Sequence, residues 1–192
     1  MLIRRTDLAM EAHELWRGGE KKKLRGVDHR TVFRRGYRVT SVAVTDDQAA
    51  HALGKPVGNY ITLDLAPLLR DAESPVERAS RAVGAELRAL MGENVKSVLV
   101  AGLGNAAMTP DAIGPLASEH VLATRHLGEV PDFSVLTAVS VLTPGVLGRT
   151  GIEALEIVRG AARAVQPDAV IVIDALAARS LTRLCTSVQL SD

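Results

Sequence analysis

The sequence predicts an α/β fold, a mostly parallel sheet with helices on both faces. In its second half, short apolar runs alternate with longer stretches in which apolar residues recur at helical spacing. The runs at 97–101 and 169–173 consist of Val, Ile, Leu, Ala and one Ser, as expected for strands that are covered on both faces. Strands and helices that alternate in this way form parallel sheets with right-handed connections.

The first half of the chain contains fewer elements with a clear pattern. Residues 36–45 alternate in polarity and are rich in β-branched side chains, which predicts a strand. A second strand is expected at 59–65, after the turn residues Gly54-Lys55-Pro56. A helix is predicted over 75–91, because Ser74-Pro75 is a favourable helix start and apolar residues then recur at helical spacing.

The second half is expected to continue with two more strand and helix pairs. After the strand 97–101 and a glycine loop, a helix is predicted from about 111 to 126. A strand at 135–142 and a helix at 150–165 follow, and the strand 169–173 comes last. Because parallel strands end at the same edge of a sheet, residues that follow these strands should gather there.

Composition limits the class of protein. With 192 residues, 47% of them hydrophobic, the chain can bury a sizeable core, and its net charge of +1 indicates neither a nucleic-acid nor a membrane partner. Its one cysteine, Cys185, excludes an internal disulfide and fits a reducing cytoplasm. No apolar run approaches the roughly 20 residues that span a bilayer. Eleven Lys or Arg fall within residues 1–40, and residues 1–35 are expected to form a basic N-terminal arm.

Two aspartates are the strongest catalytic candidates. Asp111 lies in the loop after the strand 97–101, and Asp174 directly follows the strand 169–173. The topology should bring both to one edge, where two neighbouring carboxylates do not both ionise cheaply. One can then deprotonate a water while the other donates a proton to a carbonyl oxygen. The pattern predicts aspartic-type peptide hydrolysis; the alternative is that each aspartate only stabilises a helix start or a strand end.

The loop that precedes Asp111 holds the supporting candidates Gly102, Gly104 and Asn105. Its two glycines follow a strand at the spacing of a dinucleotide-binding fingerprint. A nucleotide-binding or scaffold module without catalysis is therefore an alternative. Against it, the carboxylate of Asp111 lies near a predicted helix N-terminus, where it would repel a pyrophosphate.

Glu153 and His126 are further supporting candidates. A histidine at a helix end usually interacts with the helix dipole, and Glu153 lies in the first turn of the predicted helix 150–165. With the aspartates they could supply metal ligands from separate loops, so a metal-dependent peptidase is a second alternative. The chain has neither a His-Glu-x-x-His motif nor a Gly-x-Ser-x-Gly elbow, and no metal or other cofactor is expected.

Five short blocks occur in order along the chain. They are 5–12 (RTDLAMEA), 102–115 (GLGNAAMTPDAIGP), 124–127 (TRHL), 144–153 (PGVLGRTGIE) and 173–180 (IDALAARS). Together they resemble the germination protease family of endospore-forming bacteria, and they are far more specific than any single motif.

The resemblance implies an endopeptidase that degrades small acid-soluble spore proteins during germination, in the cytoplasm of the forespore and spore core. It implies a homotetramer that is made as a zymogen, with Asp111 and Asp174 matching the proposed catalytic pair and without a membrane or direct nucleic-acid partner. The implied fold is phosphorylase/hydrolase-like and is shared with the hydrogenase-maturation endopeptidases, which use a metal. Because family members continue past Asp192, residues 1–192 are expected to be a single α/β catalytic domain, incomplete at its C-terminus.

Overall fold

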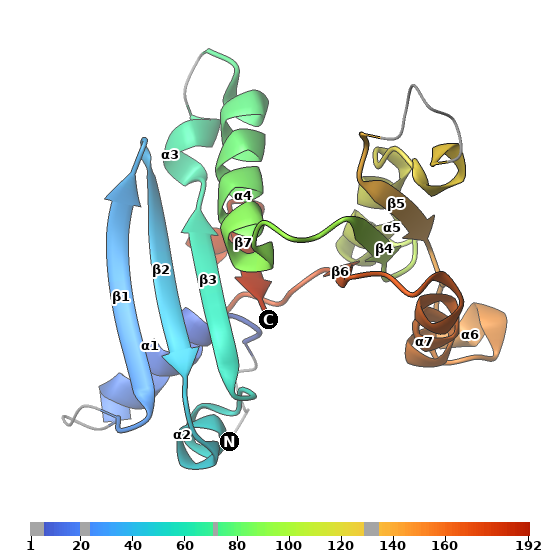
Figure 1. Cartoon of the computed structure of the whole chain (residues 1–192). Coiled ribbons are helices and arrows are strands. Elements are labelled where there is room, and N and C mark those ends of the chain that lie inside the picture. Colours follow the sequence, from blue (N-terminus) through green and yellow to red (C-terminus); the bar gives the residue numbers. More distant parts are fainter. Residues whose placement is uncertain (1–5, 20–23, 71–72, 129–134) are drawn as a thin grey trace. The chain divides into compact units, whose positions relative to one another are not determined.

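The computed structural model describes residues 6–19, 24–70, 73–128 and 135–192 (Figure 1). The chain divides into two compact units, and each has its own sheet. The first unit comprises Met1–Leu90 and Leu176–Asp192, and the second comprises Met91–Ala175. None of the described helices is long and apolar enough to cross a membrane.

The described residues of the first unit form an antiparallel sheet in the order β1-β2-β3-β7. Its strands are β1 (Val27–Arg34), β2 (Tyr37–Val44), β3 (Gly58–Asp64) and β7 (Ser187–Ser191). Arg35 and Gly36 alone connect β1 to β2, and both have positive φ, 45° and 93°. This is the type I′ geometry, whose twist matches that of a hairpin.

Helices cover both faces of this antiparallel sheet. The helices of the unit are α1 (Ala9–Gly19), α2 (Asp47–Leu53), α3 (Ala66–Leu69) and α4 (Pro75–Met91), and the 3-10 turn η4 (Leu181–Arg183) precedes β7. Val42 packs in one core cluster with residues of α1 and α2, whereas Val39 packs in another with residues of α3 and α4. Residues 39 and 42 are three positions apart along β2. Because side chains alternate between the two faces of a sheet, these two lie on opposite faces.

The second unit holds a parallel sheet in the order β5-β4-β6. Its elements are β4 (Ser97–Gly102), the 3-10 turn η1 (Thr109–Asp111), α5 (Ile113–Glu119), the 3-10 turn η2 (Arg125–Leu127), β5 (Ala138–Leu142), α6 (Leu147–Thr150), α7 (Ala154–Val165) and β6 (Ala169–Ile173). The central strand β4 is almost entirely buried. α5 packs on β4 and β6, and α7 packs on β4.

The predicted α/β class is confirmed, but the prediction of a mostly parallel sheet holds only for the second unit. The first unit is antiparallel because a two-residue turn joins β1 to β2, and so short a connection allows only an antiparallel pair. β1 and β7 were not predicted. The sequence of β1, VDHRTVFR, has no apolar pattern that would predict a strand, because most of its side chains are exposed.

Several element bounds differ from the expected ones. The bounds of α4 and β6 agree with prediction. The helix expected over 111–126 ends at Glu119, and η2 follows separately. The helix expected over 150–165 begins only at Ala154, as α7, and the separate short helix α6 precedes it and ends at Thr150, with Gly151 (φ 70°) as its C-cap. Between β2 and β3 the chain forms α2, and Gly54 is its C-cap rather than part of a simple turn.

The predicted arm at 1–35 includes residues 1–5 and 20–23, which lie outside the described residues. Within the remainder, the structure places α1 and β1. Both contribute to the core of the first unit, since Ala9 and Val27 are buried in the same cluster.

Candidate functional site

The carboxyl ends of β4 and β6 lie side by side in the second unit. Gly102 pairs with Ile173 in the parallel register, and the Leu103 N–H donates to the Ile173 carbonyl oxygen over 2.8 Å. Asp174 directly follows Ile173, so β6 delivers it to the edge where the loop 103–111 begins. In open α/β sheets this edge is where ligands bind.

The loop after β4 folds back so that Asp111 meets Asn105. The Asn105 N–H donates to the Asp111 backbone oxygen (3.1 Å) and to its carboxylate Oδ2 (2.9 Å). The Asn105 side chain in turn accepts from the Ala107 N–H at 3.0 Å, a local turn typical of asparagine. Asp111 is half-buried and belongs to η1, just before α5.

Two glycines make this close approach possible. Gly104 has φ 113°, and a Cβ added there would overlap the backbone oxygen of Asp111. A Cβ added at Gly102 would overlap the Gly114 carbonyl oxygen and the Ser118 hydroxyl of α5. Glycine at both positions therefore lets the loop and α5 close over the end of β4.

Replacing Gly104 by alanine should destabilise the second unit by about 2 kcal/mol or more, because the φ is strained for alanine and the new methyl group meets backbone. The matched control is Gly160→Ala in α7, where nothing lies within 4 Å of an added Cβ. That change should be neutral or should stabilise by up to about 1 kcal/mol. Denaturant unfolding measures both; equal stability of the two variants would contradict the close approach.

Both candidate aspartates are thus connected to the short segment 103–105. The Asn105 N–H donates to the Asp111 carboxylate. The Leu103 N–H donates to the carbonyl oxygen of Ile173, and Asp174 is the next residue. Asp174 is exposed, and its Oδ1 accepts from the Ala175 N–H at 2.8 Å. The structure therefore places both carboxylates at the carboxyl edge of the sheet, and their catalytic role stays a prediction.

A pocket of about 330 Å³ opens beside this segment. It lies at the ends of two neighbouring strands, since Ala101 of β4 pairs with Leu142 of β5. Its lining comprises Gly104, Asn105, Ala106 and Pro115 on one side and Thr143, Gly145, Val146, Arg149 and Thr150 on the other. Asn105 thus both lines the pocket and binds Asp111, so the pocket opens next to that aspartate.

Arg149 lines this pocket, although no sequence motif predicted a chemical role for it. It lies exposed in the short helix α6, between Gly145 and Gly151, both of which have positive φ. A guanidinium in this position can bind a carbonyl or carboxylate group of a ligand. In the sequence, the feature that could have indicated a role for Arg149 is its position between Gly145 and Gly151, inside the block 144–153.

Glu153 and His126 are placed differently from the other candidates. Glu153 precedes α7, and its N–H donates to the Glu156 carboxylate at 3.2 Å, which is half of a capping box. The turn that contains His126 is anchored to the amino end of β5, since the Thr124 N–H donates to the Val139 carbonyl oxygen and the Val139 N–H donates to the Thr124 hydroxyl. His126 therefore lies toward the edge opposite the two aspartates.

Among the residues that the structure describes, no three His, Cys, Asp or Glu are grouped to hold a metal ion.

Comparison with known proteins identifies the family. The family model described as germination protease matches residues 3–192. The chain is 42% identical over 194 residues to the germination protease of Caldanaerobacter subterraneus, 39% over 197 to that of Bacillus cereus strain B4264, and 38% over 194 to that of Clostridium perfringens. Each alignment covers 98% of this chain, which spans 58%, 53% and 59% of these relatives respectively. The chain belongs to the germination protease family, as the five sequence blocks had indicated.

Proposed function

We propose that this chain carries the catalytic centre of an endopeptidase of spore germination, in which Asp111 and Asp174 activate water. Family membership supports the peptidase activity and the link to germination. The two-aspartate mechanism rests on the hydrogen bonds of the segment 103–105. The Asn105 N–H binds Asp111 itself, and the Leu103 N–H binds Ile173, the residue before Asp174.

In the proposed reaction, one aspartate carboxylate takes a proton from water as the water oxygen attacks the scissile carbonyl carbon. The other, protonated carboxyl group donates its proton to the carbonyl oxygen. The tetrahedral intermediate then collapses: the first carboxyl group passes the proton from water to the leaving nitrogen, the second carboxylate takes back the hydroxyl proton of the intermediate, and the C–N bond breaks. Because the Asn105 N–H already binds Oδ2 of Asp111, Oδ1 is the oxygen that we expect to face the water.

The substrates and assembly of the whole protein form part of the same proposal. Small acid-soluble spore proteins are the expected substrates, the assembly is a homotetramer activated from a zymogen, and the place of action is the spore core. These statements rest on the family resemblance.

The test is cleavage of a purified small acid-soluble spore protein, with products identified by mass. We would assay the chain both alone and extended by the C-terminal part of the Caldanaerobacter relative, with and without a chelator. Cleavage at defined sites that persists in chelator supports water activation by carboxylates. Cleavage that chelation abolishes and added metal restores would show metal catalysis instead, and no cleavage by either form would refute the peptidase proposal.

A further inference from the structure

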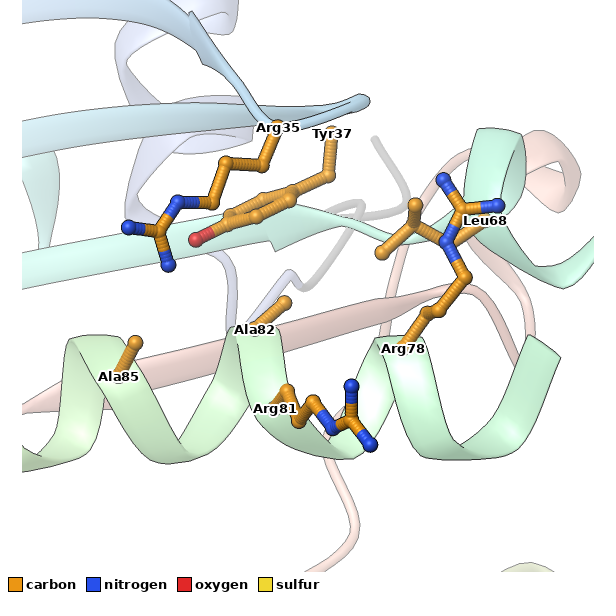
Figure 2. Close-up of a pocket in the computed structure, with 7 residues that line it drawn as sticks. All are labelled: Arg35, Tyr37, Leu68, Arg78, Arg81, Ala82 and Ala85. Atoms are coloured by element: carbon orange, nitrogen blue, oxygen red, sulfur yellow. The ribbon is translucent and has the colours of Figure 1, made fainter. Parts of the chain in front are cut away.

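A second pocket lies wholly within the first unit and is bordered by arginine side chains (Figure 2). Its volume is about 230 Å³. It is lined by Arg35 and Tyr37 at the β1–β2 turn, by Leu68 of α3, and by Arg78, Arg81 and Ala82 of α4. The guanidinium groups therefore come from two separate parts of the chain, the hairpin turn and α4.

The backbone at Arg35 gives independent evidence that its side chain has a role. Arg35 and Gly36 both have positive φ, and the first position of such a turn strongly favours asparagine or glycine. A long side chain in this conformation is unfavourable unless something compensates for it, and such residues gather at functional sites. A Cβ added at Gly36 would lie 3.3 Å from Leu68 Cδ2 and 3.5 Å from Arg78 Nη2, so the turn itself forms part of the pocket wall.

Tyr37, one of the lining residues, is held by a hydrogen bond to a buried carboxylate. Glu86 of α4 is buried, and its Oε1 accepts from the Tyr37 hydroxyl and from Arg34 Nη1, both at 3.2 Å. Burial, followed by the nearby Glu86 carboxylate, raises the pKa of Tyr37, so its hydroxyl stays protonated and remains the donor. The Glu86 charge is thus engaged by Arg34 and Tyr37.

The guanidinium group of Arg81 is only weakly engaged by a carboxylate of the chain. The Glu77 carboxylate approaches Arg81 Nη2 only to 3.8 Å, and the two side chains are 69% and 81% exposed. Exposed pairs at such a distance are weak and are screened by salt, so a ligand carboxylate can compete for Arg81.

We propose that this pocket binds a carboxylate side chain of an acidic polypeptide. Guanidinium groups bind carboxylates through paired, charge-assisted hydrogen bonds. The apolar walls at Leu68 and Ala82 suit the short apolar stem of a glutamate better than a fully hydrated inorganic anion. The identification of this polypeptide as the substrate rests on the proposed function, whereas its binding to the pocket does not.

Binding can be measured without cleavage in the Asp174→Asn chain. The probe is a fluorescein-labelled glutamate-rich peptide, followed by anisotropy, and its control is the same peptide with glutamine at every glutamate. Arg35→Asn and Arg81→Ala, added singly, should each weaken binding of the acidic peptide by about tenfold, the loss of one charge-assisted contact. Arg88→Ala removes the same charge from an exposed position of α4 outside the pocket lining, and it should change the affinity by less than about twofold.

Arg35→Asn also separates binding from folding, because asparagine suits the turn better and the variant should be at least as stable as its parent. An equal loss of affinity in Arg88→Ala, or equal binding of the glutamine peptide, would overturn the proposal. Displacement of the peptide by inorganic phosphate, but not by chloride at the same ionic strength, would show a site for inorganic anions and would also overturn it. If the acidic peptide binds as expected while the wild-type chain cuts no substrate, only the proposed peptidase function fails.

Discussion

Asp111→Asn and Asp174→Asn should each lower kcat/KM for peptide cleavage by about a thousandfold or more, because each removes one partner of the proton transfer. Asparagine keeps the shape of the side chain and one carbonyl oxygen, so at position 111 it can still accept from the Asn105 N–H. The double variant should lose little more than either single variant, since groups that act as a unit have non-additive effects. Steady-state kinetics on a spore-protein substrate provides the measurement.

The matched control is Asp168→Asn, at the other end of β6. Oδ2 of Asp168 accepts from the Lys96 N–H (2.9 Å), the Ser97 N–H (2.8 Å) and the Ser97 hydroxyl (3.0 Å), which joins the amino ends of β6 and β4. This variant should lower Tm but leave kcat/KM within about twofold. Activity that survives both substitutions at 111 and 174 would show that these aspartates are structural. An equal loss of kcat/KM in Asp168→Asn would show only that the sheet had been disturbed.

Glu11→Ala should destabilise the first unit by about 3 kcal/mol or more, because it removes the buried one of the two carboxylates that bind Arg183 and leaves two backbone N–H groups without their acceptor. The Glu11 side chain is 2% exposed. It accepts from the Thr6 hydroxyl (2.5 Å), the Arg179 N–H (2.7 Å), the Ser180 N–H (3.1 Å) and Arg183 Nη1 (2.6 Å). This carboxylate therefore binds the start of α1 to the segment that leads into β7.

Glu14 offers a control in the same helix. Its carboxylate also accepts from Arg183, at 2.9 Å, but it is 50% exposed. Glu14→Ala should therefore lose no more than about 1 kcal/mol. Urea unfolding at pH 7 compares the two variants, and equal losses would mean that burial of Glu11 does not matter.

Glu11 should also contribute to acid sensitivity. Burial alone would raise its pKa, but hydrogen bonds from Thr6, from the backbone of Arg179, from Arg183 and from the Ser180 backbone together lower the pKa below its ordinary value of 4.5. A carboxyl group with a lowered pKa in the folded state stabilises above its unfolded pKa, and this stability is lost as the pH falls through the folded value. Tm should therefore fall below about pH 4.5 more steeply in the wild-type chain than in Glu11→Gln. Parallel curves would contradict this.

The elements that the sequence predicted well are those whose signal is local. α4 and β6 have the predicted bounds because their apolar spacing and flanking residues lie within a single segment. The placement of Asp111 and Asp174 after parallel strands followed from the alternation of strands and helices, since topology alone directs the carboxyl ends of such strands to one edge. The family could be recognised because its five blocks occur in order.

Only the tertiary structure decided the features that join distant segments. β7 is recognisable as a strand by its pairing with β3, and Glu11 meets Arg183 across 172 positions of sequence. The arginine pocket likewise combines a hairpin turn with α4, and the bond between Asn105 and Asp111 depends on a loop that folds back on itself. Such contacts leave no periodic pattern in either segment, because they depend on where the chain returns in space. The sequence by itself therefore determined the family, the α/β class and the candidate aspartates, whereas the antiparallel sheet, the buried Glu11 cluster and the basic pocket arose only when the chain folded.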